Sequence, residues 1–306
     1  MAKSEKTALL VVTLLLCVML FVIIVRANTR NDGARVYRIS VITDDSQGDY
    51  SQNTRKGLDR AARDYNVDLQ IIAVHDGATS AQQADALTRE MESGADAILL
   101  YLLHCPDLDP SAELSHITVP IVSLGAPFDS AYTACSVSSD DVAVGRMLAQ
   151  TLLEDNVATC YVRSSYSNAR IRKRFQGFKD TMTAAGVHCT LEEDASAAAW
   201  TDIPSGAAVA ALDEPSLEKL TRGALSGRVT LYGIGCTNEL LNDLEDGLIR
   251  RLIVEDDYAM GYLAVQSAVE SIEARNTVRE HILTSYVADR AHLYSEPLQH
   301  VLFPIS

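Results

Sequence analysis

Basic residues are scarce in this chain relative to acidic ones. Its 306 residues include 26 Lys and Arg against 41 Asp and Glu, which gives a formal net charge of −15 at pH 7. A surface this acidic repels the phosphate backbone of nucleic acids, so the charge balance argues against nucleic-acid binding. Because 47% of the residues are hydrophobic, the chain can still bury a sizeable core, and its length predicts about two domains.

Several motifs of metal, cofactor and catalytic chemistry are missing. The six cysteines form no CxxC pair and no Cys/His spacing typical of zinc, so no metal site is predicted. No GxGxxG or GxxxxGK fingerprint follows an expected strand, and no Ser/His/acid set can be inferred. We therefore expect no cofactor and no enzymatic activity.

The longest apolar run lies at the N-terminus. Residues 8–25, ALLVVTLLLCVMLFVIIV, reach the minimum length of a membrane-spanning helix. We expect residues 1–35 to form a single-pass anchor and a short polar linker. A cleaved signal peptide is the alternative, because residues 25–27 place small side chains around a cleavage position. In both cases the rest of the chain is expected outside the cytoplasm.

After the linker, apolar strands alternate with segments of helical spacing. The expected strands are residues 36–43, 67–74, 95–103, 119–125, 157–163, 187–194, 206–212, 229–235 and 248–256. The expected helices are residues 53–65, 79–94, 110–116, 141–153, 168–185, 214–225 and 258–274. Such alternation predicts right-handed crossovers and parallel sheets covered on both faces. Two successive runs of this kind predict two α/β lobes.

Seven segments carry a family resemblance. In chain order they are ISVIT…KGLDRAARDYNVDLQII, GADAILLY, VPIVSLG, SVSSDDVAVGRMLAQTLL, ARIRKRFQGFKDTM, VAALDEPSLEKL and LYGIGCTNELLNDLEDGLIRRLIVEDDYAMGYLAV. In order and spacing they resemble the type I periplasmic binding proteins, in particular the ribose/galactose branch, over residues 36–287. The resemblance implies two doubly wound, Rossmann-like α/β lobes joined by three hinge crossovers, with a ligand in the cleft between them. The implied lobes are residues 36–137 plus 256–284 and residues 138–255 plus 285–306.

The resemblance implies that the first strand is followed by a ligand loop. Tyr50 takes the position of an aromatic residue that stacks on a sugar ring, unless it is an ordinary surface tyrosine. Asp45, Gln47 and Asp49 offer acceptors for hydroxyl groups or for a cation. Capping of the next helix would explain Asp49 but not all of these polar residues.

Later segments would complete the implied site. Arg172 matches an arginine that donates paired hydrogen bonds to sugar oxygens, and Arg170 and Arg174 are expected to face solvent. Asp213 follows a strand where relatives carry Asn-Asp, and it either binds ligand or fixes the turn. The remaining candidate ligand residues are Tyr101, Cys236 and Glu255.

Three departures from the sugar-binding pattern argue against an ordinary free hexose or pentose. Gly125-Ala126 stands where relatives often carry Asp-Arg, and Leu212 stands where they carry Asn. Gly235-Cys236 replaces part of a Gly-Phe-Asp-Gly segment. Each change removes a polar partner, and an unmatched buried hydroxyl costs about 1–3 kcal/mol. The surplus acids after the first strand instead favour a ligand more basic than an ordinary sugar.

The function that the resemblance implies is capture of a small polar ligand, a sugar or a sugar derivative, by closure of two lobes. A membrane partner would then recognise the closed form. That partner is the permease of an ABC importer or, as an uncleaved anchor would favour, a sensor histidine kinase. Repressors of the lactose-repressor type share this fold, but they need a helix-turn-helix where this chain has its apolar run.

Five cysteines follow the apolar run. By the family topology, Cys160 and Cys189 lie on neighbouring strands of the second lobe, and Cys105 and Cys135 lie in or beside the sheet of the first. Disulfides form readily outside the cytoplasm. An odd number leaves at least one cysteine free, and Cys236 at the cleft is a candidate. Buried unpaired thiols are the alternative.

Overall fold

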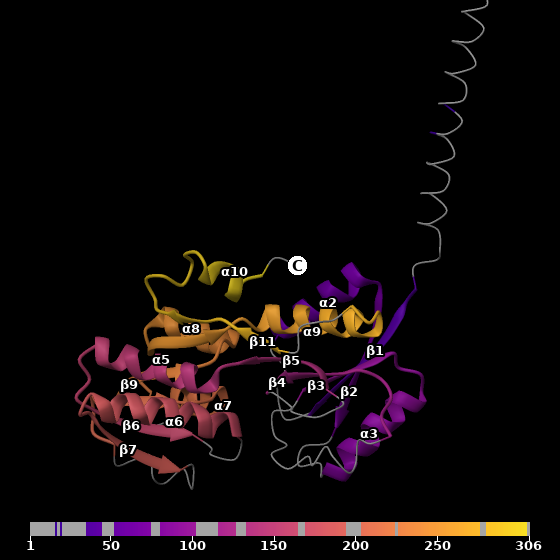
Figure 1. Ribbon diagram of the computed structural model, residues 1–306. Coiled ribbons are helices and arrows are strands. Elements are labelled where there is room, and N and C mark those ends of the chain that lie inside the picture. The colour runs from indigo at the N-terminus through magenta and orange to yellow at the C-terminus, as the bar shows by residue number, and fades with distance from the viewer. Residues whose placement is uncertain are drawn as a thin grey trace, which may run out of the picture. The chain divides into compact units, whose positions relative to one another are not determined.

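Figure 1 shows the protein as a computed structural model. The structure describes Leu16, Met19 and residues 35–44, 52–74, 80–101, 116–126, 133–164, 169–193, 203–223, 226–275 and 280–304. The chain divides into two compact units, Met1–Tyr37 and Arg38–Ser306. The expected membrane anchor lies outside the described residues, apart from Leu16 and Met19. In the part of the chain that the structure describes, no helix combines the length and apolarity needed to cross a membrane.

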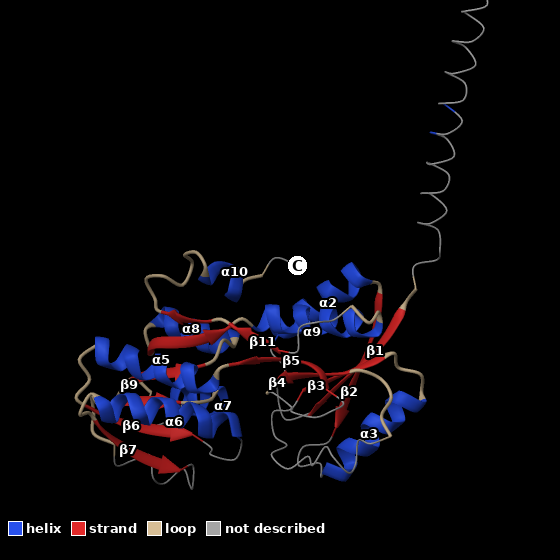
Figure 2. Cartoon of the chain, viewed as in Figure 1, coloured by secondary structure: helices blue, strands red, loops and turns tan. Residues whose placement is uncertain are grey.

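The first lobe is a six-stranded sheet in the order β11-β5-β4-β3-β1-β2. Its strands are β1 (Tyr37–Asp44), β2 (Val67–Val74), β3 (Ala97–Tyr101), β4 (Ile121–Gly125), β5 (Thr133–Ser139) and β11 (Glu280–Leu283). Its helices are α2 (Gln52–Tyr65), α3 (Ser80–Glu92) and α9 (Asp257–Ile272). Figure 2 shows α2 and α9 on one face of this sheet and α3 on the other. Every residue of β3 and β4 is buried as a result, as expected for parallel strands covered on both faces.

The second lobe repeats this plan with the strand order β12-β10-β9-β8-β6-β7. Its strands are β6 (Thr159–Ser164), β7 (His188–Glu193), β8 (Ala208–Ala211), β9 (Thr230–Ile234), β10 (Ile249–Glu255) and β12 (Ser285–Ala288). Its helices are α5 (Asp141–Glu154), α6 (Ala169–Ala184), α7 (Glu214–Arg222), α8 (Asn238–Asp246) and α10 (Leu298–Leu302). The pair β10 and β12 is antiparallel, while β10, β9, β8, β6 and β7 pair in parallel. The sequence prediction of two α/β lobes with parallel sheets is therefore confirmed.

Single residues join the two sheets at three crossings. They are Asp140 between β5 and α5, Asp256 between β10 and α9, and Thr284 between β11 and β12. Leu283 pairs with Ser139 at the end of the first sheet, and Ser285 pairs with Glu255 at the end of the second. The carboxyl ends of both sheets therefore meet at these crossings. In open α/β sheets this is the edge where ligands bind.

The two helices that start at crossings share one sequence pattern, DDxAxG. It spans Asp140–Gly145 at α5 and Asp256–Gly261 at α9. The first aspartate of each is the N-cap, and its carboxylate accepts a hydrogen bond from the backbone N–H of Ala143 or Ala259, at 3.0 and 2.9 Å. The two lobes therefore begin these helices in the same way.

The glycine that ends this pattern lets a partner helix approach closely. A Cβ atom at Gly145 would lie 1.8 Å from the carbonyl oxygen of Arg174 in α6, and one at Gly261 would lie 2.2 Å from that of Thr54 in α2. No side chain fits at such a distance. The pair α5 and α6 and the pair α2 and α9 therefore pack backbone against backbone.

Several elements are absent from the sequence prediction. Strand β5, TACSVSS, is polar but lies buried between β4 and β11, where Ser136 accepts a 2.8 Å hydrogen bond from the Ser123 hydroxyl. The short elements β11, β12, α8 and α10 were also not predicted. The helix expected at 110–116 lies outside the described residues, except for His116, which is in a turn.

Candidate functional site

Part of the predicted ligand site lies outside the described residues. Asp45, Gln47, Asp49 and Tyr50 all fall in the segment 45–51, between β1 and α2. The same holds for the segments that follow β3, β4, β6 and β7, namely residues 102–115, 127–132, 165–168 and 194–202. What the structure describes of the site is the ends of the strands and the first turns of the helices.

Two arginines of α6 form a buried charge network with acids at two of the crossings. Arg174 bonds through Nε to Asp141 at 2.9 Å and through Nη2 to Glu255 at 2.7 Å. Arg170 bonds to the same two carboxylates, at 3.3 and 3.1 Å. Asp141 begins α5 just after one crossing, and Glu255 ends β10 just before another. The network therefore connects both crossings to one helix of the second lobe.

The arginine charges set the ionisation of Glu255. Burial alone would favour the neutral acid, but the charges of Arg174 and Arg170 outweigh it and lower the pKa of Glu255 to about 2. Burial also opposes the charge on Arg170, yet Glu255 and Asp141 keep its pKa above the ordinary value. Arg174 further donates to the carbonyl oxygen of Leu212 at 3.1 Å. Glu255 is therefore ionised at neutral pH, and several hydrogen bonds hold the network together.

The expectation that Arg170 and Arg174 face solvent is wrong. They are one helical turn apart, on the face of α6 that packs against α5, and their side chains are only 11% and 7% exposed. Arg172 lies two residues from each, about 200° around the helix, and is exposed. Ile171, Phe178 and Met182 form a buried stripe along α6, and their helical spacing also includes position 174. This spacing is the signal in the sequence that could have predicted the burial of Arg174.

A second polar cluster lies beside the network at the carboxyl ends of β9 and β10. Glu214 begins α7 and accepts a hydrogen bond from the backbone N–H of Cys236 at 2.7 Å. The thiol of Cys236 donates to Asp257 at 3.0 Å. Burial and the nearby charge of Asp257 raise the pKa of Glu214 to about 8, against the opposing hydrogen bond from Cys236. Glu214 therefore carries a proton at pH 7.

The predicted ligand residue Cys236 is buried within this cluster. Burial, followed by the charges of Asp257 and Glu214, raises the pKa of its thiol well above the usual value. A protonated, buried thiol is a poor nucleophile. Tyr101, another predicted residue, ends β3, is 7% exposed, and lies close enough to influence the pKa of Arg170. The structure therefore brings Tyr101, Cys236 and Glu255 to one region.

Asp213 occupies the turn between β8 and α7. Its carboxylate accepts hydrogen bonds from the backbone N–H of Ser216, at 2.8 Å, and from the hydroxyl of Ser164. The first bond makes Asp213 the N-cap of α7, and the second ties the turn to the end of β6. The turn-fixing role that the sequence left open is thus observed, while ligand binding by Asp213 stays a prediction.

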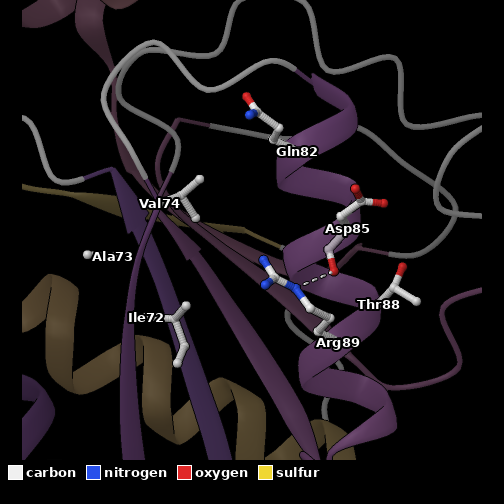
Figure 3. Close-up of a pocket in the computed structure, with 7 residues that line it drawn as sticks. All are labelled: Ile72, Ala73, Val74, Gln82, Asp85, Thr88 and Arg89. Carbon is white, nitrogen blue, oxygen red and sulfur yellow. Dashed lines mark hydrogen bonds between the residues drawn. The ribbon is translucent and has the colours of Figure 1, made fainter.

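Figure 3 shows a surface pocket of about 510 Å³ in the first lobe, away from these clusters. Its lining residues are Ile72, Ala73 and Val74 of β2 and Gln82, Asp85, Thr88 and Arg89 of α3. Within it, the Arg89 side chain donates to the backbone oxygen of Asp85 at 3.3 Å, one turn earlier in the same helix. Its polar groups come from a single helix, so it does not join residues of the two lobes.

Comparison with known proteins finds a match to one family and similarity to many solved structures. The family model of the periplasmic binding protein domain matches residues 39–276. No curated protein matches the chain. A glucose-galactose binding protein from Geobacillus stearothermophilus is similar at 20% identity and a TM-score of 0.69, over 86% of this chain and 100% of that chain.

Two further solved structures show how widely this fold is used. An ABC transporter solute-binding protein from Agrobacterium vitis, with bound D-fucose, is 18% identical with a TM-score of 0.75, over 87% of this chain and 100% of that chain. A protein from Bacteroides fragilis that is described as a putative LacI transcriptional regulator is 13% identical with a TM-score of 0.71, over 85% of this chain and 99% of that chain. At these identities the similarity establishes the fold, which transport proteins and a regulator share.

Proposed function

Because the chain belongs to the periplasmic binding protein family, we propose that it is an extracytoplasmic solute-binding protein for an ABC importer. It captures a small polar ligand, a sugar or a sugar derivative, between its two lobes. The observation that carries the proposal is the meeting of the carboxyl ends of both sheets at the three crossings. Polar side chains gather there, in the position where open α/β sheets bind ligands.

Similarity to sugar-binding proteins supports the ligand class. The relatives from G. stearothermophilus and A. vitis are described as a glucose-galactose binding protein and as a protein with bound D-fucose. The departures at Gly125, Leu212 and Gly235 remove polar partners that sugar binders often carry. The acids at 44–49 favour a ligand with a basic group, so amino sugars belong to the proposed class.

The proposed ligand residues divide into two groups. Tyr50 stacks on the ligand, and Asp45, Gln47 and Asp49 accept its polar hydrogens. Arg172, exposed on α6, donates to ligand oxygens. Tyr101, Asp213, Cys236 and Glu255 form the floor, where their bonds to protein groups fix its shape.

Capture follows from hinge motion at the crossings. We take the two lobes as the rigid bodies. Their bounds are those that the sequence predicts, residues 36–137 plus 256–284 and residues 138–255 plus 285–306, with the first boundary moved to Asp140, directly after the end of β5. Asp140, Asp256 and Thr284 are single residues between regular elements, so small changes of backbone angle there turn one lobe against the other. The closed form presents both lobes to the importer.

Thermal-shift measurements test the proposal. Purified protein is screened against D-galactose, D-glucose, D-fucose and their amino-sugar counterparts, and binding of a ligand at 100 times its Kd stabilises the fold by about 2.7 kcal/mol. A rise in Tm in the wild type is expected to shrink strongly in Arg172→Met and in Tyr50→Ala. The matched control is Arg146→Met, an exposed arginine of α5.

Two outcomes contradict the proposal. One is a panel without any Tm rise in a protein whose wild-type melting is cooperative. The other is a sugar that stabilises the wild type and both variants equally, because the binding site would then lie elsewhere.

A membrane-tethered sensor is the second candidate function, and the apolar run 8–25 favours it. Such a protein keeps its anchor and signals to a histidine kinase in the same membrane. Intact mass spectrometry of the membrane fraction distinguishes the two forms of the N-terminus. A chain cut near residue 27 removes the argument for the sensor, whereas a retained run 8–25 supports it.

A further inference from the structure

Two cysteines lie side by side at the edge of the second sheet. Cys160 of β6 pairs directly with Cys189 of β7, so both side chains point to the same face of the sheet. They pack in the hydrophobic cluster beneath α6, with 3.0 Å between their sulfur atoms. The family topology predicted this neighbourhood from the sequence, and the strand register confirms it.

The geometry of this pair is compatible with a disulfide bond. Neighbouring strands are about 4.8 Å apart, within the range of Cα separations of about 4.4–6.8 Å that disulfides span. The sulfur atoms need to approach each other by only about 1 Å to reach the bond length. Among the strands that the structure describes, β7 stands at the edge of its sheet and pairs only with β6 (Figure 1). An edge strand has one neighbour to hold it, so we expect it to accommodate this approach.

One of the two thiols is reachable from outside. Cys189 is half-buried and lines a surface pocket of about 520 Å³, together with Phe175, Lys179 and His188. Cys160 is 1% exposed. An oxidant therefore meets Cys189 first, and the sulfur of Cys189 is the group that the Cys160 sulfur contacts, at 3.0 Å.

The hydrogen bond between the two thiols favours Cys189 as the first of the pair to react. Cys160 S–H donates to the sulfur of Cys189. This bond stabilises a thiolate at Cys189 and lowers its pKa, against the opposing effect of burial. The same bond, aided by burial, raises the pKa of Cys160 and keeps it protonated.

We infer that Cys160 and Cys189 form a redox-active pair that an external disulfide oxidises to an intramolecular disulfide. The Cys189 thiolate attacks one sulfur of the external disulfide, forms a mixed disulfide and releases the first thiolate. The sulfur of Cys160 then attacks the Cys189 sulfur and displaces the second sulfur of the external disulfide, which takes up the Cys160 proton and leaves as a thiol. Two protein thiols are oxidised, and the external disulfide takes up two electrons and leaves as two thiols.

This modification site is separate from the proposed ligand site. It lies at the strand β7 edge, whereas Cys236 lies at the carboxyl ends of β9 and β10 and bonds to Asp257. Oxidising surroundings outside the cytoplasm would favour the bond. The inference itself needs only the purified protein, so it stands or fails independently of sugar binding.

Peptide mapping after controlled oxidation tests the inference. Full-length protein is incubated with glutathione disulfide, its remaining thiols are alkylated, and trypsin is added. Cleavage after Arg163 and Lys179 separates the two cysteines, so a linked pair of peptides reports the bond. We expect this linked species to dominate, to disappear on reduction, and to raise Tm by about 5 °C or more through the closed chain loop.

Variants identify the order of attack. Cys160→Ser is expected to trap glutathione on Cys189, whereas Cys189→Ser leaves Cys160 unmodified because it is buried. Cys135→Ser, at another buried thiol, is the matched control and keeps the linked species. Circular dichroism checks that each variant is folded, and Cys160→Ala replaces Cys160→Ser if the serine variant is not.

Two results would overturn the inference. One is glutathione retained on Cys189 of the wild type while Cys160 stays free for alkylation. The other is a folded wild type in which neither thiol reacts, although the same oxidant converts an exposed reference thiol.

Discussion

At the scale of single residues, Glu214 shows how surroundings decide the charge state of a side chain. It lies among the acids Asp257, Glu255 and Glu218, and its nearest polar partner is the backbone N–H of Cys236. Sequence reasoning singled out Asp213 next to it, because that residue follows a strand. Glu218 lies one turn further along α7, but Glu255 and Asp257 come from β10 and α9, which are distant in the chain, so the protonation of Glu214 could not be predicted from neighbours in sequence.

The raised pKa of Glu214 predicts a pH dependence of stability. Its ordinary pKa is 4.5 and its pKa in the folded protein is about 8, so the folded state binds a proton that the unfolded state has lost. The stabilisation is complete below pH 4.5 and is lost as the pH rises to 8. We expect Glu214→Gln, which cannot ionise, to gain about 3 kcal/mol relative to the wild type between pH 5 and 8.

Urea unfolding of both proteins at several pH values measures this difference. Glu92→Gln, at an exposed acid of α3, is the control and should leave the pH dependence unchanged. Parallel pH curves for the wild type and Glu214→Gln would show that Glu214 is ionised in the folded protein.

At the scale of helices and strands, the two crossings Asp140 and Asp256 begin the same local structure. Both provide an N-cap and are followed five residues later by a glycine that faces a partner helix. The backbone of this glycine is helical, so its conformation would allow any residue. Glycine is needed there because a side chain would collide with the partner helix. Helix α6 packs against one face of α5. This packing brings Asp141 of α5 to Arg170 and Arg174 of α6, which form ion pairs with it.

Substitution of Gly145 tests this close packing. In a free helix, alanine in place of glycine stabilises by about 1 kcal/mol. Here its Cβ would lie 1.8 Å from the Arg174 carbonyl oxygen, so α5 and α6 must separate. We expect Gly145→Ala to lower the free energy of unfolding by about 3 kcal/mol.

The comparison variant is Gly186→Ala, where φ is +72° and no atom lies within 4 Å of the added Cβ. Only backbone strain of about 1 kcal/mol is expected there. Denaturant unfolding compares the two variants. If both variants lost the same free energy of unfolding, or if Gly145→Ala were more stable than the wild type, α5 and α6 would separate without a loss of stability.

At the scale of the whole molecule, the α6 arginines connect the crossings to the second lobe. Asp141 and Glu255 stand next to Asp140 and Asp256, and both bond to Arg174. The C-terminal helix α10 adds another link, because its core residues pack in the second lobe while Asn53 of α2 donates to the Leu302 carbonyl oxygen at 3.1 Å. The two lobes are therefore linked by side-chain contacts as well as by the connecting backbone.

Removing one arginine should destabilise the molecule. Arg174→Met leaves Asp141 and Glu255 buried with Arg170 as their remaining cation, and breaking a buried ion pair typically costs about 3–5 kcal/mol. Arg172→Met, two residues away on the exposed face, should change the free energy of unfolding by about 0.5 kcal/mol or less. Calorimetry of both variants tests this contrast. Similar losses of Tm would contradict the opposite placement of the two side chains.

The sequence by itself determined the class of fold and the family. Local periodicity predicted the strands and helices, and the order of seven segments predicted the periplasmic binding protein family, which is confirmed. Both depend on interactions near in the chain or on patterns along it. Strand β5 escaped prediction because TACSVSS is polar, and its burial comes from β4 and β11 on either side.

The tertiary structure alone decided which charged side chains are buried and which groups meet. Arg170 and Arg174 turn inward because α5 packs against their face of α6, and Glu214 keeps its proton because acids of three elements surround it. Cys160 and Cys189 come within 3.0 Å through the register of β6 and β7. Contacts between distant parts of the chain set these features. The sequence carried only partial signals for them, namely the helical period around Arg174 and the family topology that places Cys160 and Cys189 on neighbouring strands.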